Sequence, residues 1–161
     1  MADEHAYRVS AWWTSGRTGL AKCDSAPNVI HFSEAEEFGG LAGRWTPEQL
    51  LLSALAACFT TTFEAVARSA KFPYTDLEVE VEGTARKDKL ECSFSEIVMR
   101  PRLTVQSEGE LDEGMGLLRQ AKSLCLIARA ISVPQTADLK VEVGRIPAGG
   151  RVAEAVVKLE V

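Results

Sequence analysis

The sequence has no CxxC or HxxxH motif and few histidines. His5 and His31 are the two histidines in the chain, and both lie far in sequence from the cysteines at positions 58 and 125. Structural zinc sites need four nitrogen or sulfur ligands, usually in closely spaced pairs. We therefore expect neither a metal site nor a resident cofactor.

The sequence also lacks an excess of positive charge. The net charge is −5, and the basic residues are scattered, with the run RKDK at 86–89 as their densest group. Binding to nucleic-acid phosphates normally requires a basic face. We expect no nucleic-acid partner, and we interpret residues 86–89 as a solvated turn between strands.

Long hydrophobic runs and secretion signals are missing as well. No uncharged apolar run approaches the ~20 residues of a membrane span. The first residues, MADEHAYRVS, lack the basic and apolar regions of a signal peptide. We expect a cytoplasmic protein with no membrane partner. Thiols stay reduced in that compartment, so the four cysteines are expected to be inert or catalytic rather than structural disulfides.

What the sequence does contain is typical of one globular domain. Its 161 residues are 46% apolar and 25% charged, which favours a single domain over 1–161 with a real core. Helices are predicted from Pro47 to about Ala70 and from about Asp112 to Ile131, and a mobile glycine-rich loop over 34–44. Strands are predicted over 6–14, 20–23, 28–32, 76–85, 93–105, 139–143 and 153–161, with a turn at 147–150. This order predicts an α+β fold with antiparallel sheets, in which Pro101 marks a bulge or an edge.

The first helix has the clearest signals. Thr46 is a good N-cap, Pro47 suits the first helical position, and Gln49 completes a T-x-x-Q capping box. Apolar residues lie on both of its sides, so we expect a long central helix buried almost all round. The face that carries Cys58 consists of Leu51, Leu55, Cys58, Thr62 and Val66.

Two cysteines are the candidate chemical groups, because Cys58 and Cys125 each lie near the middle of a predicted helix. A single buried cysteine usually behaves as a small hydrophobic residue. Two of them can meet where their helices pack, and a disulfide requires a Cα separation of ~4.4–6.8 Å. Cys23 and Cys92 lie on predicted strands without a partner pattern, and we interpret both as structural filler.

A charged pair suited to activating a thiol lies upstream. Arg17 stands in a glycine-flanked turn, and Glu48 in the first turn of the Cys58 helix. A guanidinium near a thiol favours the thiolate, and a carboxylate can hold that guanidinium in a bidentate grip. Each residue also has an ordinary explanation: Arg17 as a solvated loop charge, and Glu48 as a favourable charge at a helix start.

Three segments together resemble the OsmC/Ohr family of thiol-dependent peroxidases, named for osmotic inducibility and organic hydroperoxide resistance. They are SGRTGLAK at 15–22, WTPEQLLLSALAACF at 45–59, and SLCLIARAI at 123–131. Their order and spacing fit across nearly the whole chain. One departure is Leu126, since family members commonly carry proline directly after the second cysteine.

The resemblance implies a fold, a mechanism and partners. It implies an OsmC-like fold and an intertwined homodimer in which both chains complete each active site. Cys58 would be the peroxidatic cysteine and Cys125 the resolving one. Arg17 would stabilise the thiolate and Glu48 would hold Arg17. The substrate would be an organic hydroperoxide, and an external dithiol, possibly of lipoyl type, would be the reductant.

Two other functions stay open on the residues alone. The domain could bind an apolar ligand and keep its cysteines as packing, or it could be a thiol redox sensor without turnover. A binder would leave the Cys58 thiol near its ordinary pKa, and a sensor would not turn over with a dithiol.

Overall fold

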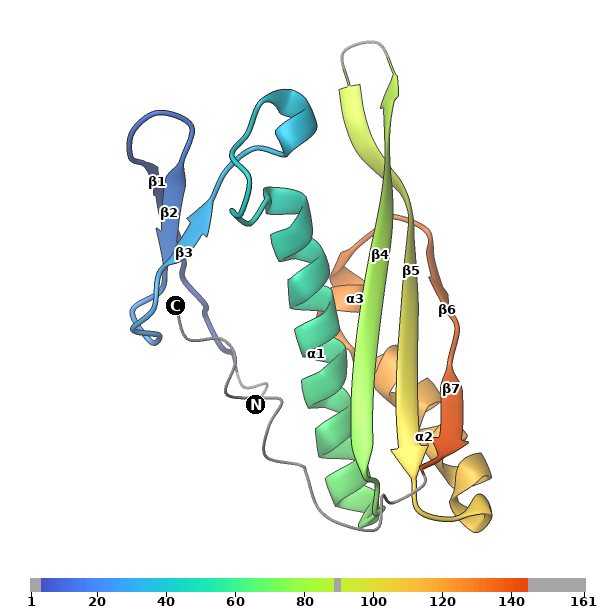
Figure 1. The fold of residues 1–161 in the computed structure, drawn as a ribbon. Helices are drawn as coiled ribbons and strands as arrows, with labels where there is room; N and C mark the ends of the chain where they lie inside the picture. Colours follow the sequence, from blue (N-terminus) through green and yellow to red (C-terminus); the bar gives the residue numbers. More distant parts are fainter. Residues whose placement is uncertain (1–3, 89–90, 145–161) are drawn as a thin grey trace. The chain divides into compact units, whose positions relative to one another are not determined.

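The computed structural model describes residues 4–88 and 91–144 (Figure 1). The chain divides into two compact units, Met1–Leu55 and Ala56–Val161, and each is described by itself. The predicted strand over 153–161 and the predicted turn at 147–150 lie outside the described residues.

The N-terminal unit is built on a small antiparallel sheet. Its strands β1 (Ser10–Trp13), β2 (Gly19–Lys22) and β3 (Ile30–Phe32) lie in the order β1-β2-β3. The three predicted strands are confirmed in shorter form. The predicted loop over 34–44 contains a short 3-10 helix, η1 (Glu36–Phe38).

Helix α1 (Pro47–Ala70) begins in this unit as the capping residues predict. The backbone N–H of Gln49 donates to Thr46 Oγ1 at 3.2 Å, and the backbone N–H of Thr46 donates to Gln49 Oε1 at 3.1 Å. The reciprocal pair satisfies N–H groups that a helix start leaves without intrahelical partners. The predicted capping box is confirmed.

The C-terminal unit packs helices on a larger sheet. It contains the rest of α1 and, in chain order, β4 (Asp76–Asp88), β5 (Glu91–Val105), η2 (Glu108–Glu110), α2 (Leu111–Leu124), α3 (Leu126–Ala130), β6 (Gln135–Ala137) and β7 (Lys140–Val143). Strands β4 and β5 form a long antiparallel pair, while β6 and β7 both run parallel to β5. The prediction of antiparallel sheets is therefore confirmed for β1–β3 and for the β4–β5 pair, and is wrong for β6 and β7. Helices α2 and α3 form a crossover that returns the chain in the direction of β5.

Two local predictions in this sheet are also wrong. Residues 86–88 of the RKDK run belong to strand β4 rather than to a turn. Arg86 pairs with Ser93 and Lys87 with Cys92 inside the β4–β5 ladder. Pro101 lies at neither an edge nor a bulge, since β5 has neighbours on both sides. It falls between the residues that pair with β6, which end at Met99, and those that pair with β7, which begin at Arg102. A missing N–H at that position interrupts neither parallel ladder.

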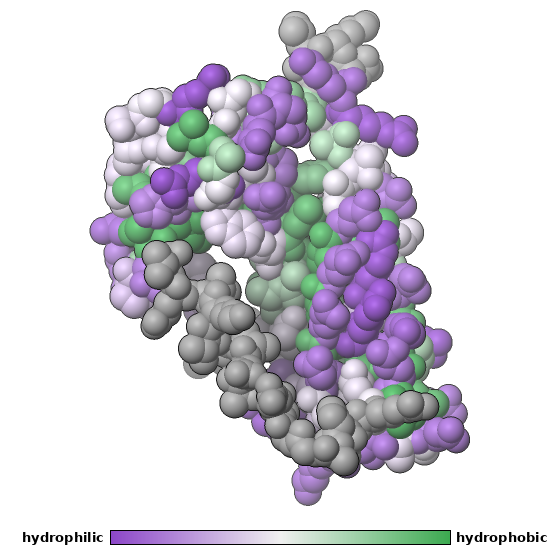
Figure 2. All heavy atoms as spheres, in the orientation of Figure 1, coloured by the Kyte–Doolittle hydropathy of each residue, from purple (hydrophilic) through white to green (hydrophobic). Residues whose placement is uncertain are grey.

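The core of this unit lies on one face of the sheet. Every second residue of β5 is buried, namely Ile97, Met99, Pro101, Leu103 and Val105. The other face is charged: Arg100 lies 2.8 Å from carboxylate oxygens of both Glu80 and Glu82. Hydrophilic side chains cover β4 and β5 in Figure 2. This alternation is typical of a sheet that is buried on one side only.

Helix α1 is buried along one stripe and not almost all round. Phe59, Phe63, Val66 and Ala67 are buried, whereas the side chain of Leu51 is 37% exposed. The prediction of all-round burial is wrong for the single chain. The length and apolar composition of α1 would also suit a membrane span, but the buried stripe of this helix is typical of a helix in a globular core. The ring of Phe63 makes an edge-to-face contact with Tyr74 at 5.3 Å.

The second long helix is not continuous. Helix α2 ends at Leu124, and α3 starts at Leu126, so Cys125 stands between them with φ −59° and ψ 112°. The prediction of one helix from Asp112 to Ile131 with Cys125 at its middle is wrong, although the α+β fold class is confirmed.

Helix α2 approaches the sheet through Gly114, which gives a test of the packing. A Cβ at Gly114 would lie 3.0 Å from Leu103 and 3.2 Å from Val141, whereas a Cβ at Gly116 would have no atom within 4 Å. We expect Gly114→Val to destabilise the fold by about 1–3 kcal/mol through overpacking. The matched Gly116→Val should change stability by about 0.5 kcal/mol or less. Urea unfolding of both variants measures the difference, and equal stabilities would contradict this packing.

Candidate active site

Cys58 lies at the middle of α1, in the C-terminal unit, with its side chain half-buried. The backbone N–H of Ile127, at the start of α3, donates to Cys58 Sγ at 3.5 Å. Thr62, one turn later on α1, donates its hydroxyl to the carbonyl oxygen of Cys58 at 2.7 Å. These contacts place the Cys58 sulfur where α1 meets the junction of α2 and α3.

The break at Cys125 supplies the amide donors. The first N–H groups of any helix have no intrahelical partner. Because the backbone turns at Cys125, α3 makes a fresh start, and the amides of its first residues become available to the sulfur atoms. The N–H of Arg129 then donates to the carbonyl oxygen of Cys125 at 3.1 Å, which closes the first turn of α3.

The two thiols have opposite pKa shifts. Burial opposes the charged form of Cys58, but hydrogen bonds outweigh it, and the pKa of Cys58 lies below its ordinary value. The donors to the Cys58 sulfur are, in decreasing order of effect, the Ile127 N–H, the Cys125 thiol and the Leu126 N–H. Burial raises the pKa of Cys125, and the neighbouring Cys58 raises it further by hydrogen bonding and charge, against the backbone N–H of Ala128.

The arrangement brings together the two cysteines predicted to meet. Cys58 is the thiol that ionises first, and Cys125 is fully buried, with its thiol directed to Cys58 as a donor. A thiolate is the nucleophilic form of cysteine. The pair therefore has one reactive sulfur and one protonated sulfur beside it.

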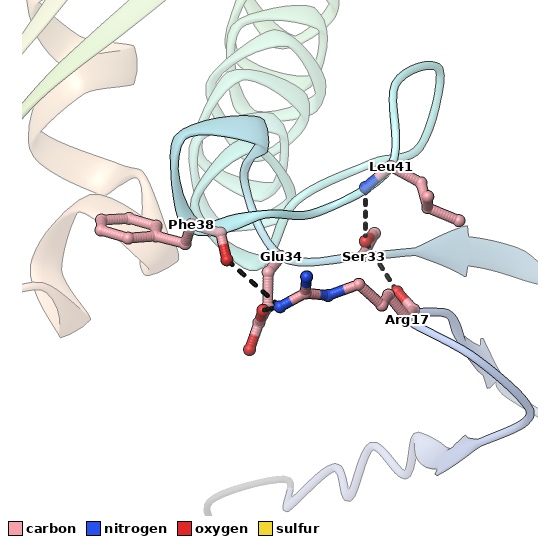
Figure 3. Close-up of polar contacts among 5 residues, drawn as sticks. All are labelled: Arg17, Ser33, Glu34, Phe38 and Leu41. Atoms are coloured by element: carbon pink, nitrogen blue, oxygen red, sulfur yellow. Dashed lines mark hydrogen bonds and ion pairs between the residues drawn. The ribbon is translucent and has the colours of Figure 1, made fainter.

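The Arg17 guanidinium makes two polar contacts in the N-terminal unit (Figure 3). Its Nη2 lies 3.7 Å from a carboxylate oxygen of Glu34 and 3.5 Å from the carbonyl oxygen of Phe38. Its own carbonyl accepts a hydrogen bond from Ser33 Oγ at 2.7 Å, and the same Ser33 oxygen accepts the N–H of Leu41 at 3.0 Å. Ser33 thus ties the Arg17 turn to the loop after β3.

The position of the Arg17 guanidinium depends on glycine at residue 39. Gly39 has φ +85°, and a Cβ there would lie 2.6 Å from Arg17 Nη1. A side chain would therefore both strain the backbone and displace the guanidinium.

The carboxylate near Arg17 is Glu34, and not the Glu48 that the sequence suggested. Within residues 4–88 and 91–144, the ion pair of Arg17 is the one with Glu34. Glu48 lies in the first turn of α1, where an acid suits the helix dipole. The predicted action of Arg17 and Glu48 on Cys58 stays a prediction.

The two remaining cysteines have surroundings of their own. Cys23 Sγ lies 3.4 Å from Ser25 Oγ in the turn after β2, and that hydrogen bond lowers the pKa of Cys23. Cys92 is exposed near the end of the β4–β5 ladder. An exposed thiol does not fill a core, so the interpretation of Cys92 as structural filler is wrong.

Sequence reasoning missed the amide donors around the Cys58 sulfur. The Cys125 thiol could be found, because the two cysteines are predicted to meet. The amides of Leu126 and Ile127 could not, because no glycine or proline marks the break before them.

Comparison with known proteins places the chain in a family. Residues 40–143 match the family model described as OsmC-like protein. The chain belongs to this family. A relative in Bacillus subtilis, the uncharacterized protein YmaD, is 28% identical over 134 residues, which cover 81% of this chain and 89% of YmaD.

Solved structures of the family share the fold. An OsmC-like protein of unknown function from Vibrio cholerae has a TM-score of 0.74 at 16% identity, over 84% of this chain and 99% of that one. An organic hydroperoxide resistance protein OsmC from Legionella pneumophila has a TM-score of 0.68 at 23% identity, over 87% of this chain and all of that one.

The opposite pKa shifts of the two thiols can be measured. We expect alkylation of Cys58 by iodoacetamide to rise with pH through a midpoint below the ordinary thiol value, and that of Cys125 through a midpoint above it. Mass spectrometry of each peptide after timed labelling gives both profiles. A shared midpoint for the two cysteines would contradict the assignment.

Proposed function

We propose that this protein is a thiol-dependent peroxidase that reduces organic hydroperoxides to alcohols. The observation that carries the proposal is the pair of cysteines: Cys58 has a lowered pKa and Cys125, still protonated, is its hydrogen-bonding neighbour. Membership of the OsmC-like family and the similarity to an organic hydroperoxide resistance protein support a redox role.

The proposed first step is attack of the Cys58 thiolate on the distal oxygen of the hydroperoxide. The O–O bond breaks, the sulfur is oxidised to a sulfenic acid, and the alkoxide takes a proton and leaves as the alcohol. The donors that stabilise the thiolate are fixed backbone groups of α3 and the Cys125 thiol. They need little reorganisation before the reaction.

The proposed second step is condensation of Cys125 with the sulfenic acid. A disulfide forms between Cys58 and Cys125, and the sulfenic oxygen leaves as water with the proton of the Cys125 thiol. An external dithiol, possibly of lipoyl type, then reduces the disulfide by exchange and is itself oxidised to a disulfide.

The assembly and location belong to the same proposal. We infer a cytoplasmic homodimer, with no nucleic-acid or membrane partner and no resident cofactor. Exposed apolar side chains support an association of two chains: Leu51 is 37% exposed and Trp45 is 49% exposed in the single chain.

The roles of the two cysteines predict separable effects. Cys58→Ser should abolish consumption of an organic hydroperoxide, because it removes the nucleophile. Cys125→Ser should leave the first turnover intact and stop dithiol-coupled turnover, because the sulfenic acid cannot form the internal disulfide. Stopped-flow and steady-state assays with cumene hydroperoxide and a dithiol measure both steps, with Cys92→Ser as the control.

Two results of these assays would contradict the proposed function in different ways. Full activity of Cys58→Ser would refute the enzyme. A lowered pKa of Cys58 without dithiol-coupled turnover in the wild-type protein would identify a redox sensor instead.

The role proposed for Arg17 is tested through its two candidate carboxylates. Arg17→Ala should raise the pKa of Cys58 and slow peroxide reduction, and Arg17→Lys should restore only part of the rate because it loses the planar fork. If Glu48 holds Arg17 during the reaction, Glu48→Gln should slow reduction by about 10-fold or more, and Glu34→Gln should not. Single-turnover rates with all four variants decide this. Wild-type rates for Arg17→Ala would reduce Arg17 to a turn residue.

A further inference from the structure

A cavity with basic residues in its lining opens at the surface beside α3, and the peroxidase mechanism uses none of the lining side chains. Its volume is about 350 Å³, and its lining comes from the end of α2, from α3 and from β6. The lining residues are Arg119, Lys122, Ser123, Ala128, Arg129 and Gln135. The volume lies at the lower end of the range for small-molecule sites.

The charge in this cavity is of one sign. Its ionisable lining residues are Arg119, Lys122 and Arg129, in a chain whose net charge is −5. Within the ranges 4–88 and 91–144, none of these side chains has an ion pair with a carboxylate. Arg119 and Lys122 stand three residues apart on α2 and therefore repel each other.

The ordinary explanation accounts for only one of the three cations. Lys122 lies in the last turn of α2, where a positive charge suits the helix dipole. That explanation does not cover why Arg119 and Arg129, on different helices, line the same cavity.

The cavity is held in shape by hydrogen bonds that do not need a ligand. Gln135 Nε2 donates to the carbonyl oxygens of Ala128 and Ile131, at 2.8 and 3.0 Å. These bonds fix the end of α3 to β6. The wall that carries Arg129 is therefore set before anything binds, which lowers the ordering cost of binding.

We propose that this cavity binds a small anion with two or more negative charges, of the phosphate-ester or polycarboxylate class. Three cationic side chains around one small volume match such a ligand in charge. The arginine forks offer paired N–H donors of the geometry that phosphate and carboxylate oxygens accept. The aliphatic stems of the cations and Ala128 leave room for a short carbon skeleton.

The test is calorimetric titration of the full chain with inorganic phosphate and, separately, with citrate. We expect saturable binding of at least one of them, with one site per chain. Arg119→Gln and Arg129→Gln should each weaken that binding by about 10-fold or more, since a charge-assisted hydrogen bond is lost. Tighter binding of phosphate assigns the phosphate class, and tighter binding of citrate assigns the polycarboxylate class.

Two controls separate a built site from general electrostatic attraction. Arg68→Gln makes the same charge change on α1, at a residue that does not line the cavity, and should leave affinity within about two-fold. Ala128→Met keeps every charge but fills part of the cavity and should weaken binding. The absence of saturable binding, equal weakening by Arg68→Gln, or unchanged binding by Ala128→Met would each overturn the proposal. Cys58→Ser should bind the anions as the wild type does, so this result is independent of the peroxidase proposal.

Discussion

The backbone turn at Cys125 is the constraint on which the cysteine site depends. If α2 had continued through Cys125, the N–H groups of Leu126 and Ile127 would have bonded to carbonyls one turn earlier, as in any helix interior. With ψ at 112°, the helix ends and restarts, and these amides are released toward Cys58. A half-buried thiolate is unfavourable without such donors. The break therefore supplies the amide donors that favour ionisation of the half-buried Cys58 thiol.

The sheet in turn fixes where that break stands. Helix α2 packs closely on β5 and β7 because Gly114 leaves room for Leu103 and Val141, and Gln135 ties the end of α3 to β6. Helix α1 contributes its buried stripe to the same core. Because Cys58 lies on α1 and Cys125 lies at the junction of α2 and α3, their separation is set by the packing of these helices rather than by the cysteines themselves.

Features of the fold that depend on neighbouring residues in the sequence could be predicted from those residues. The start of α1 follows from Thr46 and Gln49 alone, and the cysteine pair follows from two apolar segments. The break at Cys125 could not be predicted in this way, because Leu126, Ile127 and Ala128 are residues that a continuous helix accepts. It lies in the crossover between β5 and its parallel neighbours β6 and β7, whose pairing the local sequence around Cys125 does not reveal.

Pro101 and Arg17 are two further residues whose surroundings are set by segments distant in the sequence. Proline in a strand suggests an edge when the strand is considered alone, but two short parallel neighbours leave a gap at Pro101. For Arg17 the sequence and its family resemblance suggested Glu48 as the carboxylate partner, whereas the ion pair in the structure is with Glu34. The choice of Glu34 follows from the turn at Gly39, whose missing side chain makes room for the guanidinium.

The donors around Cys58 and the guanidinium of Arg17 differ in a way that matters for the proposed chemistry. Amide donors are part of the backbone, so neither a side-chain substitution nor a change of ionisation removes them. Together with the Cys125 thiol, they lower the pKa of Cys58 within the C-terminal unit. A guanidinium on a loop can exchange one carboxylate partner for another at small cost, because exposed ion pairs contribute little. The Arg17–Glu34 pair is more than half exposed on both sides. The resting charge on Cys58 therefore depends on the permanent donors, and any added effect of Arg17 depends on which partner holds it.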